Sequence, residues 1–328
     1  MRMLSEMTAR TREWHRPMVF FTGAMAVMAV VSALGMLFDS RTLAGEPIWQ
    51  KDFDFALSIG MYCLTWAWLT SMLPRGRRTA SWVSTALVAL LSVEYILLTV
   101  QIIRGQRSHF NKSTDLNSAL GNVMGISAGL ILVGSLVLAF VFVFVPVGDP
   151  ADRWAIRLGA LLSVAGMAFG PMMGAATPQQ QAAKAAGTWD GIQGAHSVGV
   201  ADGSGPLMPI TGWSETGGDL RIPHLVGLHA LQALPVLVLL LVLGSRWVPK
   251  LRSSVVRARL VGVGAVGWAG LLAIVGWQAL RGQPLIHPDA LTLGAFGLLV
   301  ALVVVLAGLV LVLSKPVRAE ATAALTAA

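Results

Sequence analysis

Three polar side chains, His224, His229 and Gln232, lie in the stretch DLRIPHLVGLHALQALP, residues 219–235, which leads into an apolar run. Polar groups are rare in membrane-spanning helices and usually serve a function when they occur there. At about 100° per residue the three side chains fall within one arc of a helix, so we expect them to face a common interior. An imidazole in such a place can act as a base or as a ligand.

A carboxylate, Glu94, lies in the apolar stretch LLSVEYILLTVQII, residues 90–103. An ionised carboxylate in hydrocarbon costs several kcal/mol, so Glu94 must be protonated, paired or in contact with a wet cavity. Gln101 follows seven residues later, on the same face of a helix. We predict that Glu94 and His229 point into one interior space and form a catalytic pair.

Residues 104–115, RGQRSHFNKSTD, offer Arg104 and His109 between two apolar runs, and Arg221 precedes a third run. Arginine suits the recognition of a carboxylate or a phosphate because its guanidinium group can donate two parallel hydrogen bonds. The predicted ligand-binding residues are Gln101, Arg104, His109, His224, Gln232 and Arg221. The alternative for His224 and His229 is a structural role, in which each is hydrogen-bonded to a neighbouring helix. For residues 104–115 the alternative is a solvated loop.

Metal chemistry is left open by the pattern of histidines. Single histidines at 109, 224 and 229 are candidate metal ligands, but the five-residue spacing of His224 and His229 is poor for one ion. No two spans carry the facing histidines that hold a b-type haem, so we do not expect haem. The chain has one cysteine, Cys63, and therefore no cysteine-based metal motif.

The composition is that of an all-α integral membrane protein. Of 328 residues, 55% are hydrophobic and 12% charged, with a mean hydropathy of +0.70, whereas soluble domains carry about 25% charged residues. The net charge of +8 comes from short clusters between apolar runs, so we do not expect nucleic acid as a partner.

Eight segments are long enough to cross a bilayer, which takes roughly 20 apolar residues. They cover about 17–38, 55–73, 82–103, 120–145, 156–176, 222–243, 260–280 and 291–313. We predict a first bundle of four helices at 17–147 and a second at 148–314. Tails at 1–16 and 315–328 flank them.

The orientation follows from lysine and arginine, which favour the cytoplasmic side of a membrane. With a cytoplasmic N-terminus, sixteen of the 24 Lys and Arg residues fall on the cytoplasmic side and the other eight on the far side. Both termini are therefore predicted to be cytoplasmic. Five histidines, at 109, 196, 224, 229 and 287, then lie on the extracytoplasmic side.

The two predicted bundles resemble each other in sequence. QIIRGQ at 101–106 and QALRGQ at 278–283 close the third and seventh spans, and SIGMYCLT at 58–65 aligns with LVGLHALQ at 225–232. We therefore expect a parallel four-plus-four repeat, with a site between the halves.

Residues 177–221 form a loop too long for a simple connector. We predict a partly ordered lid over the site, and the alternative is an extracytoplasmic linker.

These patterns predict a multi-pass protein of a bacterial plasma membrane, surrounded by the lipid bilayer. Its extracytoplasmic pocket would bind a small molecule, a metal ion or a lipid head group, and the protein could be a membrane-embedded enzyme. One alternative is a proton-coupled transporter of small solutes, in which Glu94 carries the proton. Another is an accessory subunit that packs against a membrane-protein partner through the uniformly apolar last helix.

Overall fold

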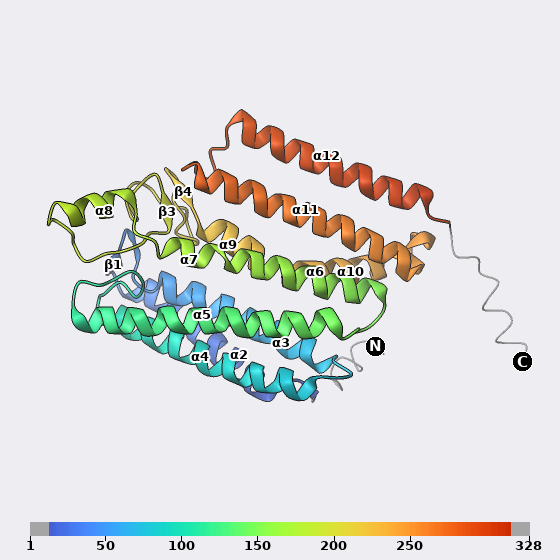
Figure 1. Cartoon of the computed structure of the whole chain (residues 1–328), viewed down its shortest axis with the longest axis horizontal. Helices are drawn as coiled ribbons and strands as arrows, with labels where there is room; N and C mark the ends of the chain where they lie inside the picture. The colour runs from blue at the N-terminus through green and yellow to red at the C-terminus, as the bar shows by residue number, and fades with distance from the viewer. Residues whose placement is uncertain (1–12, 316–328) are drawn as a thin grey trace, which may run out of the picture.

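The computed structural model describes residues 13–315, and it is mostly helical. The predicted tails, 1–16 and 315–328, lie almost wholly outside the described residues. The main helices are α2 (Arg16–Phe38), α3 (Gln50–Ser71), α4 (Arg77–Ile103), α5 (Asp115–Phe144), α6 (Pro150–Met167), α7 (Phe169–Met173), α9 (Arg221–Leu228), α10 (Ala230–Gly244), α11 (Ser254–Leu280) and α12 (Ala290–Leu313). Figure 1 shows the long helices side by side along one axis.

The helices make this a multi-pass membrane protein. Within residues 13–315, six are long and apolar enough to cross a bilayer, or seven if α9 and α10 together form one span. Their outward faces are rich in large apolar side chains, as lipid contact requires. Helix α3 is not among the six, because its polar residues lower its hydropathy.

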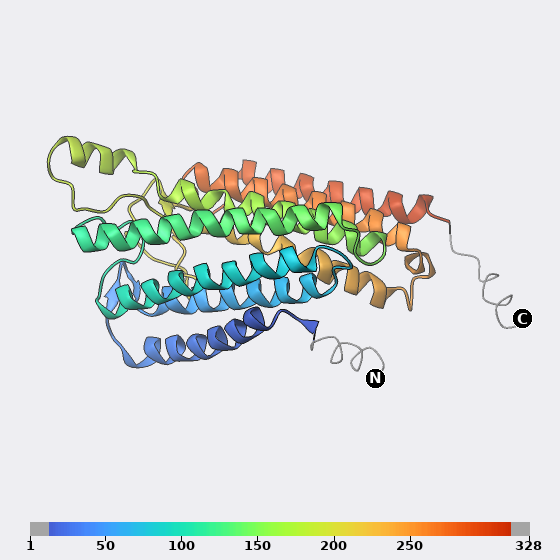
Figure 2. The ribbon, with the colours of Figure 1, turned by 60° about the horizontal axis from the view of Figure 1, so that its bottom comes forward.

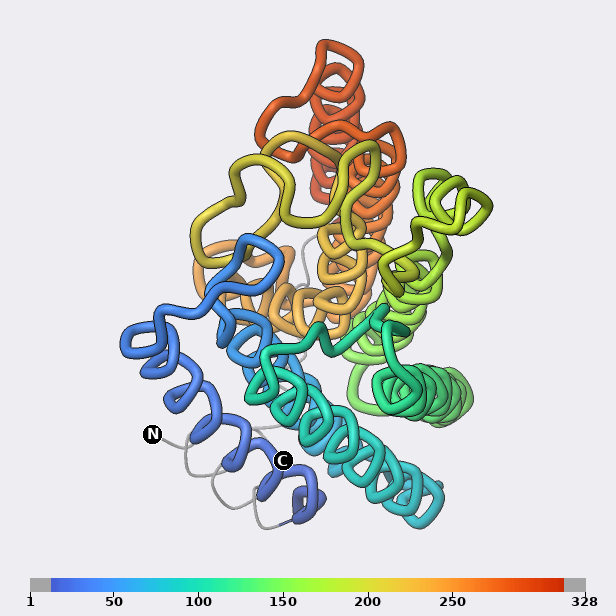
Figure 3. The backbone as a smooth tube through the Cα atoms, turned by 90° about the vertical axis from the view of Figure 1, so that its left-hand side faces the viewer, coloured from blue at the N-terminus to red at the C-terminus, as the bar shows by residue number. Residues whose placement is uncertain are grey.

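The two ends of the bundle differ (Figure 2). At one end, here called the loop end, lie the connections 39–49, 104–114, 174–220 and 281–289. At the other, the terminal end, α2 begins and α12 ends, and the connections 72–76, 145–149 and 245–253 are short. Figure 3 looks onto the loop end and shows the long connection folded over the helices.

Apolar side chains form one large core and a smaller one. The large core lies among α2, α3, α4 and α5 and holds Trp66, Leu87 and Phe142. The smaller core joins α6, α10 and α11 through Ala155, Leu234 and Val261, so α6, which also contributes to the large core, connects the two. The four-plus-four repeat stays a prediction.

Helix α3 is fastened to its neighbours by a buried carboxylate. Asp52 has no exposed surface and accepts hydrogen bonds from Ser32 of α2 at 2.9 Å, and from Tyr95 and Thr99 of α4 at 2.9 and 2.8 Å. A buried carboxylate is stable in a fold only when its oxygens are satisfied in this way. Asp52 therefore holds three helices together near the loop end.

Helices α9 and α10 meet at a bend of 43° at His229. The bend is accompanied by a close crossing of α9 and α6, where a Cβ built on Gly227 would lie 2.3 Å from the Cα of Gly166. The indole of Trp268 in α11 donates a hydrogen bond of 2.8 Å to the carbonyl of Val226, just before the bend. In a continuous helix, that carbonyl would accept from the amide of Ala230.

The long connection at the loop end contains secondary structure of its own. Helix α8 (Pro178–Ala185) begins with a capping box in which the side chains of Thr177 and Gln180 each accept a backbone hydrogen bond from the other residue. Strands β3 (Ser197–Val198) and β4 (Gly218–Asp219) then pair antiparallel, as do β1 (Thr42–Leu43) and β2 (Glu46–Pro47) before α3.

Candidate functional site

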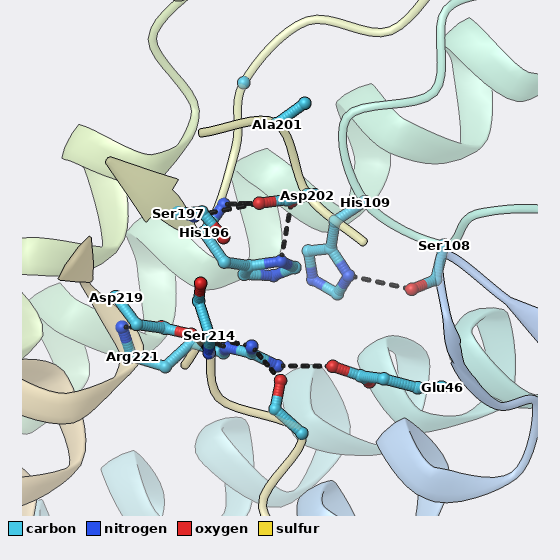
Figure 4. Close-up of polar contacts among 12 residues, drawn as sticks. Glu46, Ser108, His109, His196, Ser197, Ala201, Asp202, Ser214, Asp219 and Arg221 are labelled. Atoms are coloured by element: carbon cyan, nitrogen blue, oxygen red, sulfur yellow. Dashed lines mark hydrogen bonds and ion pairs between the residues drawn. The ribbon is translucent and has the colours of Figure 1, made fainter. Parts of the chain in front are cut away.

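Ionisable side chains from three segments meet at the loop end. Lys51 comes from the first turn of α3, His109 from the connection between α4 and α5, and His196 and Asp202 from the connection 174–220. Figure 4 shows the rings of His109 and His196 beside one another, with Asp202 next to His196. These four residues are here called the loop-end cluster.

Backbone contacts fix the two connections against each other. The amide of Lys112 donates to the carbonyl of Gly191 at 2.6 Å, and the amide of Gln193 donates to the carbonyl of Phe110 at 2.8 Å. Gly191 has φ +86°, and a Cβ there would lie 2.5 Å from the Cα of Ser113. Only glycine allows this backbone conformation at so short a separation, so Gly191 lets the connection approach the site.

His196 is oriented by Asp202. Its Nδ1 lies 3.0 Å from Oδ2 of Asp202, and the carboxylate also accepts from the amides of His196 and Ser197, at 3.0 and 2.8 Å. Burial alone would raise the pKa of Asp202, but these hydrogen bonds outweigh it and hold the pKa well below its ordinary value. Burial, and then the charge of Lys51, lower the pKa of His196 to about 4.

A neutral His196 next to an ionised Asp202 has one defined tautomer. The proton lies on Nδ1, where the carboxylate accepts it, so Nε2 keeps a free lone pair. This is the arrangement by which a carboxylate prepares an imidazole to accept a proton.

His109 is the second imidazole of the cluster. Its Nδ1 lies 3.0 Å from Oγ of Ser108, and its ring centre lies 5.7 and 6.1 Å from those of Phe55 and Phe110. Burial, followed by the charge of Lys51 and the neighbouring His196, keeps the pKa of His109 well below its ordinary value. Both imidazoles are therefore neutral near neutral pH.

Lys51 is the cation of the cluster. Its Nζ lies 6.0 Å from the ring centres of both Phe55 and Phe110, at the outer limit of a cation–π contact. In the described part of the chain its ammonium group makes no ion pair. The cluster thus combines one positive charge with two neutral imidazoles and an aromatic wall.

Arg221, one of the predicted ligand-binding residues, is engaged by the protein itself. Its Nη2 lies 2.7 Å from Oδ2 of the buried Asp219, and its Nη1 lies 3.0 Å from Oε1 of Glu46. The same guanidinium donates to the carbonyl of Gly212 at 2.6 Å. Arg221 therefore joins β4, β2 and the connection between β3 and β4; Figure 4 shows its contacts with Asp219 and Glu46.

Gln101 and Arg104 form a second polar group, at the end of α4. Gln101 is fully buried, donates to Oδ1 of Asn117 at 3.2 Å and accepts from Arg104. Arg104 also donates to Oδ1 of Asn117, at 3.2 Å. This group joins the end of α4 to the start of α5.

The three polar residues of the stretch 219–235 face different neighbours. Nδ1 of His224 lies 2.9 Å from the carbonyl of Gly166, and Gln232 donates to Oγ1 of Thr65 at 3.0 Å. His229 lies at the bend between α9 and α10, half-buried. These contacts join the stretch to α6 and to α3.

Glu94 is buried in α4, with 5% of its surface exposed. Its Oε1 accepts no hydrogen bond from residues 13–315. No hydrogen bond or ion pair joins Glu94 to His229 within the same residues, so their pairing stays a prediction.

The described residues include no group of three His, Cys, Asp or Glu side chains close enough to hold a metal ion. A metal at any of the candidate ligands, His109, His224 or His229, would need its remaining ligands from outside these side-chain types. The loop-end cluster offers two nitrogen ligands, and a lysine lies beside them.

Three members of the loop-end cluster, Lys51, His196 and Asp202, were not among the predicted site residues. Of these three, only His196 stands out in the sequence, because it is one of five histidines predicted to lie on the extracytoplasmic side of the membrane. The pairing of His196 with Asp202 arises from the folded connection, which has no helical period from which it could be predicted.

Comparisons of this chain with family models, with curated proteins and with solved structures find no match, so the geometry above carries the functional argument alone.

Proposed function

We propose that the protein binds a small anionic molecule, one that carries a carboxylate or a phosphate, in the loop-end cluster. The observation that carries this proposal is the charge of Lys51, which lies beside two neutral imidazoles without an ion-pair partner in the described chain. Lys51 is half-buried, and a cation that is partly removed from water is costly unless an anion compensates it. A bound anion would supply that compensation and accept hydrogen bonds from the ammonium group of Lys51.

The His196–Asp202 pair adds a chemical capacity to the binding site. With Nδ1 held by Asp202, Nε2 of His196 is free to accept a proton from a bound molecule or from a water beside it. We therefore propose that His196 acts as the base of this site and that Lys51 positions the anionic group.

The test is ligand-dependent stabilisation of the purified chain in a neutral detergent. Small carboxylates and phosphate esters, with their neutral amides and alcohols as controls, would be screened by thermal unfolding. We expect acidic compounds to raise the Tm of the unmodified chain and of Lys112→Met, which removes an exposed lysine from the same end. In Lys51→Met, that stabilisation should disappear.

Two outcomes would contradict the proposal. One is equal stabilisation of both variants by the acidic compounds. The other is a screen in which neutral compounds stabilise the protein as well as acidic ones do.

A proton-coupled transporter is the second candidate, because of Glu94 and the bend at His229. Glu94 has a buried oxygen without a hydrogen-bond partner among the described residues, and interrupted helices are frequent at transporter sites. In proteoliposomes under a proton gradient, this candidate predicts proton uptake that Glu94→Gln abolishes. Uptake that is unchanged in the variant would exclude Glu94 as the proton carrier.

We also infer that α3 is an eighth span and that the protein lies in the plasma membrane with its terminal end in the cytoplasm. The 22 residues of α3 reach about 33 Å, enough to cross the hydrocarbon core. Half of its residues are buried against other helices, including Asp52, so its polar groups need not meet lipid. On this basis the loop-end cluster is extracytoplasmic.

A further inference from the structure

A cavity of about 490 Å³ lies at the terminal end, far from the loop-end cluster. It is half-open to the surroundings and is lined by the residues before and at the start of α2, the end of α3 and the first turns of α4. Its lining residues are Glu13, Trp14, His15, Arg16, Pro17, Thr70, Ser71, Arg77, Arg78, Ser81 and Thr85. The predicted site accounts for none of them.

The lining is strongly cationic. It contains three arginines, Arg16, Arg77 and Arg78, and one carboxylate, Glu13. Glu13 approaches only Arg77, at 3.6 Å, and both side chains are about half exposed. Arg16 and Arg78 make no ion pair with any residue in 13–315, so within these residues neither guanidinium charge is compensated.

A buried nitrogen in the cavity also lacks a partner. Nε2 of His15 lies 3.1 Å from Oγ1 of Thr85, whereas its Nδ1 is buried and makes no hydrogen bond with the described residues. The contact with Thr85 fixes the ring of His15 against α4, at the edge of the cavity.

Each free arginine is followed, one helical turn deeper, by an exposed aromatic side chain. Arg16 precedes Phe20 on α2, and Arg78 precedes Trp82 on α4, each by four residues and so on the same face. Phe20 and Trp82 are 77% and 69% exposed. Both helices therefore present a cation at the end of the bundle and an apolar surface immediately below it.

Other tryptophans place this end at the boundary between membrane and water. Trp154 near the start of α6 and Trp247 after α10 are 49% and 77% exposed at the same end. Tryptophan is enriched at the level of the lipid head groups. The cavity thus lies where phosphate groups of the bilayer are found.

We propose that this cavity binds the phosphate group of an anionic phospholipid. Arg16 and Arg78 hold the phosphate, and the acyl chains lie along Phe20 and Trp82. Basic pockets between spans are known sites for anionic lipid head groups. A free phosphate ion shares the head-group chemistry but has nothing to place against the two aromatic rings.

The test is a binding titration of the full chain in neutral detergent. The probes are short-chain phosphatidylglycerol, short-chain phosphatidylcholine and inorganic phosphate, each followed by native mass spectrometry or by the shift in Tm. The variant is Arg16→Gln with Arg78→Gln. The matched control is Arg246→Gln with Arg252→Gln, which removes two exposed arginines from the same end but outside the cavity.

We expect the unmodified chain to bind phosphatidylglycerol more tightly than either other probe. The cavity variant should weaken this binding by about 30-fold, and the control should keep it within about threefold. If the double variant does not fold, the single variants Arg16→Gln and Arg78→Gln replace it. Each should lose less affinity for phosphatidylglycerol than the double variant.

Three results would overturn the proposal. Equal affinity for phosphatidylglycerol and phosphatidylcholine would show that charge is not recognised. Equal affinity for inorganic phosphate would make this a site for a soluble anion. The same loss in the control pair would show that the surface charge of this end, and not the cavity, attracts the lipid.

Discussion

At the scale of single residues, the chemistry of the loop end depends on which nitrogen of His196 carries the proton. Asp202 takes the Nδ1 proton as its hydrogen-bond donor, and this leaves Nε2 as an acceptor. An asparagine at 202 could donate to Nδ1 instead and so reverse the tautomer. The base proposed here therefore requires a carboxylate at 202 and not only a polar side chain.

The lowered pKa of His196 predicts how stability depends on pH. The folded state binds the proton with a pKa of about 4 and the unfolded state with one of about 6.5, so between these values the unfolded state holds more protons. Stability therefore falls as the pH falls through this window, by about 2 kcal/mol for this group between pH 7.5 and pH 5. Thermal unfolding at both values should show a smaller acid-induced loss in His196→Gln than in the unmodified chain.

The control for this experiment is His287→Gln, which removes an exposed histidine from the neighbouring connection. It should keep the pH dependence of the unmodified chain. The pKa of His109 is also lowered by burial, so His196→Gln should still lose some stability in acid. An unchanged acid-induced loss in that variant would contradict the neutral, buried state of His196.

Of the loop-end cluster, only His109 was predicted as a site residue from the sequence, because it lies in a short polar stretch between two apolar runs. Other predicted residues lie outside this cluster. Glu94, His224 and Gln232 attract notice because each interrupts a hydrophobic pattern. Asp202 lies in a polar stretch where nothing distinguishes it from its neighbours. Its role comes from the tertiary fold of the connection, which brings it within 3.0 Å of His196.

At the scale of elements, hydropathy predicts the position of a helix better than its first residue. The expected span 291–313 corresponds to α12 (Ala290–Leu313), and 17–38 to α2 (Arg16–Phe38). Helix α3 begins at Gln50, five residues before the expected start at 55. The charged residues Lys51, Asp52 and Asp54 lie before the expected start, but hydrogen bonds to Asp52 from two other helices compensate for its burial within α3.

Asp52→Asn should destabilise the protein by about 2 kcal/mol, since hydrogen bonds to a charged group each contribute about 1.5–3 kcal/mol. The amide keeps one carbonyl oxygen for three hydroxyl donors, Ser32, Tyr95 and Thr99. The matched control is Asp54→Asn, which affects a hydrogen bond with Gln50 inside α3. It should lower the free energy of unfolding by less than Asp52→Asn does. Chemical unfolding in detergent would measure both, and equal effects would contradict the role of Asp52 as the link among α2, α3 and α4.

The crossing of α6 and α9 predicts a contrast between glycines. At Gly227 an added Cβ would lie 2.3 Å from the Cα of Gly166, whereas at Gly129 in α5 it would meet nothing within 4 Å. Gly227→Ala should therefore lower the free energy of unfolding by at least about 1–3 kcal/mol through overpacking. Gly129→Ala should be neutral or slightly stabilising, because alanine favours the helix. If the two variants unfold alike, the close crossing is absent in the protein.

At the scale of the whole molecule, the arrangement of the helices sets the topology. The connection 174–220 and the end of α12 lie at opposite ends of the bundle. Reporter fusions after Ser214 and after the last residue should therefore lie on opposite sides of the membrane, with the second in the cytoplasm. Only α9–α10, α11 and α12 lie between these two points, so reporters on the same side would require one of these three to be re-entrant.

The bend at His229 has a consequence for the passage of water. Where a helix is interrupted inside a membrane, the released carbonyls usually draw in water molecules. Here the indole of Trp268 occupies the carbonyl of Val226, so this carbonyl does not need a water molecule. Trp268→Phe, which removes the N–H but keeps an aromatic ring, should admit water to the bend and speed the entry of deuterium at the amide of His229, which donates to the carbonyl of Leu225 in the unmodified protein. The indole thus covers one released carbonyl at this change of direction, and a route for protons past it would open more easily when the indole moves away.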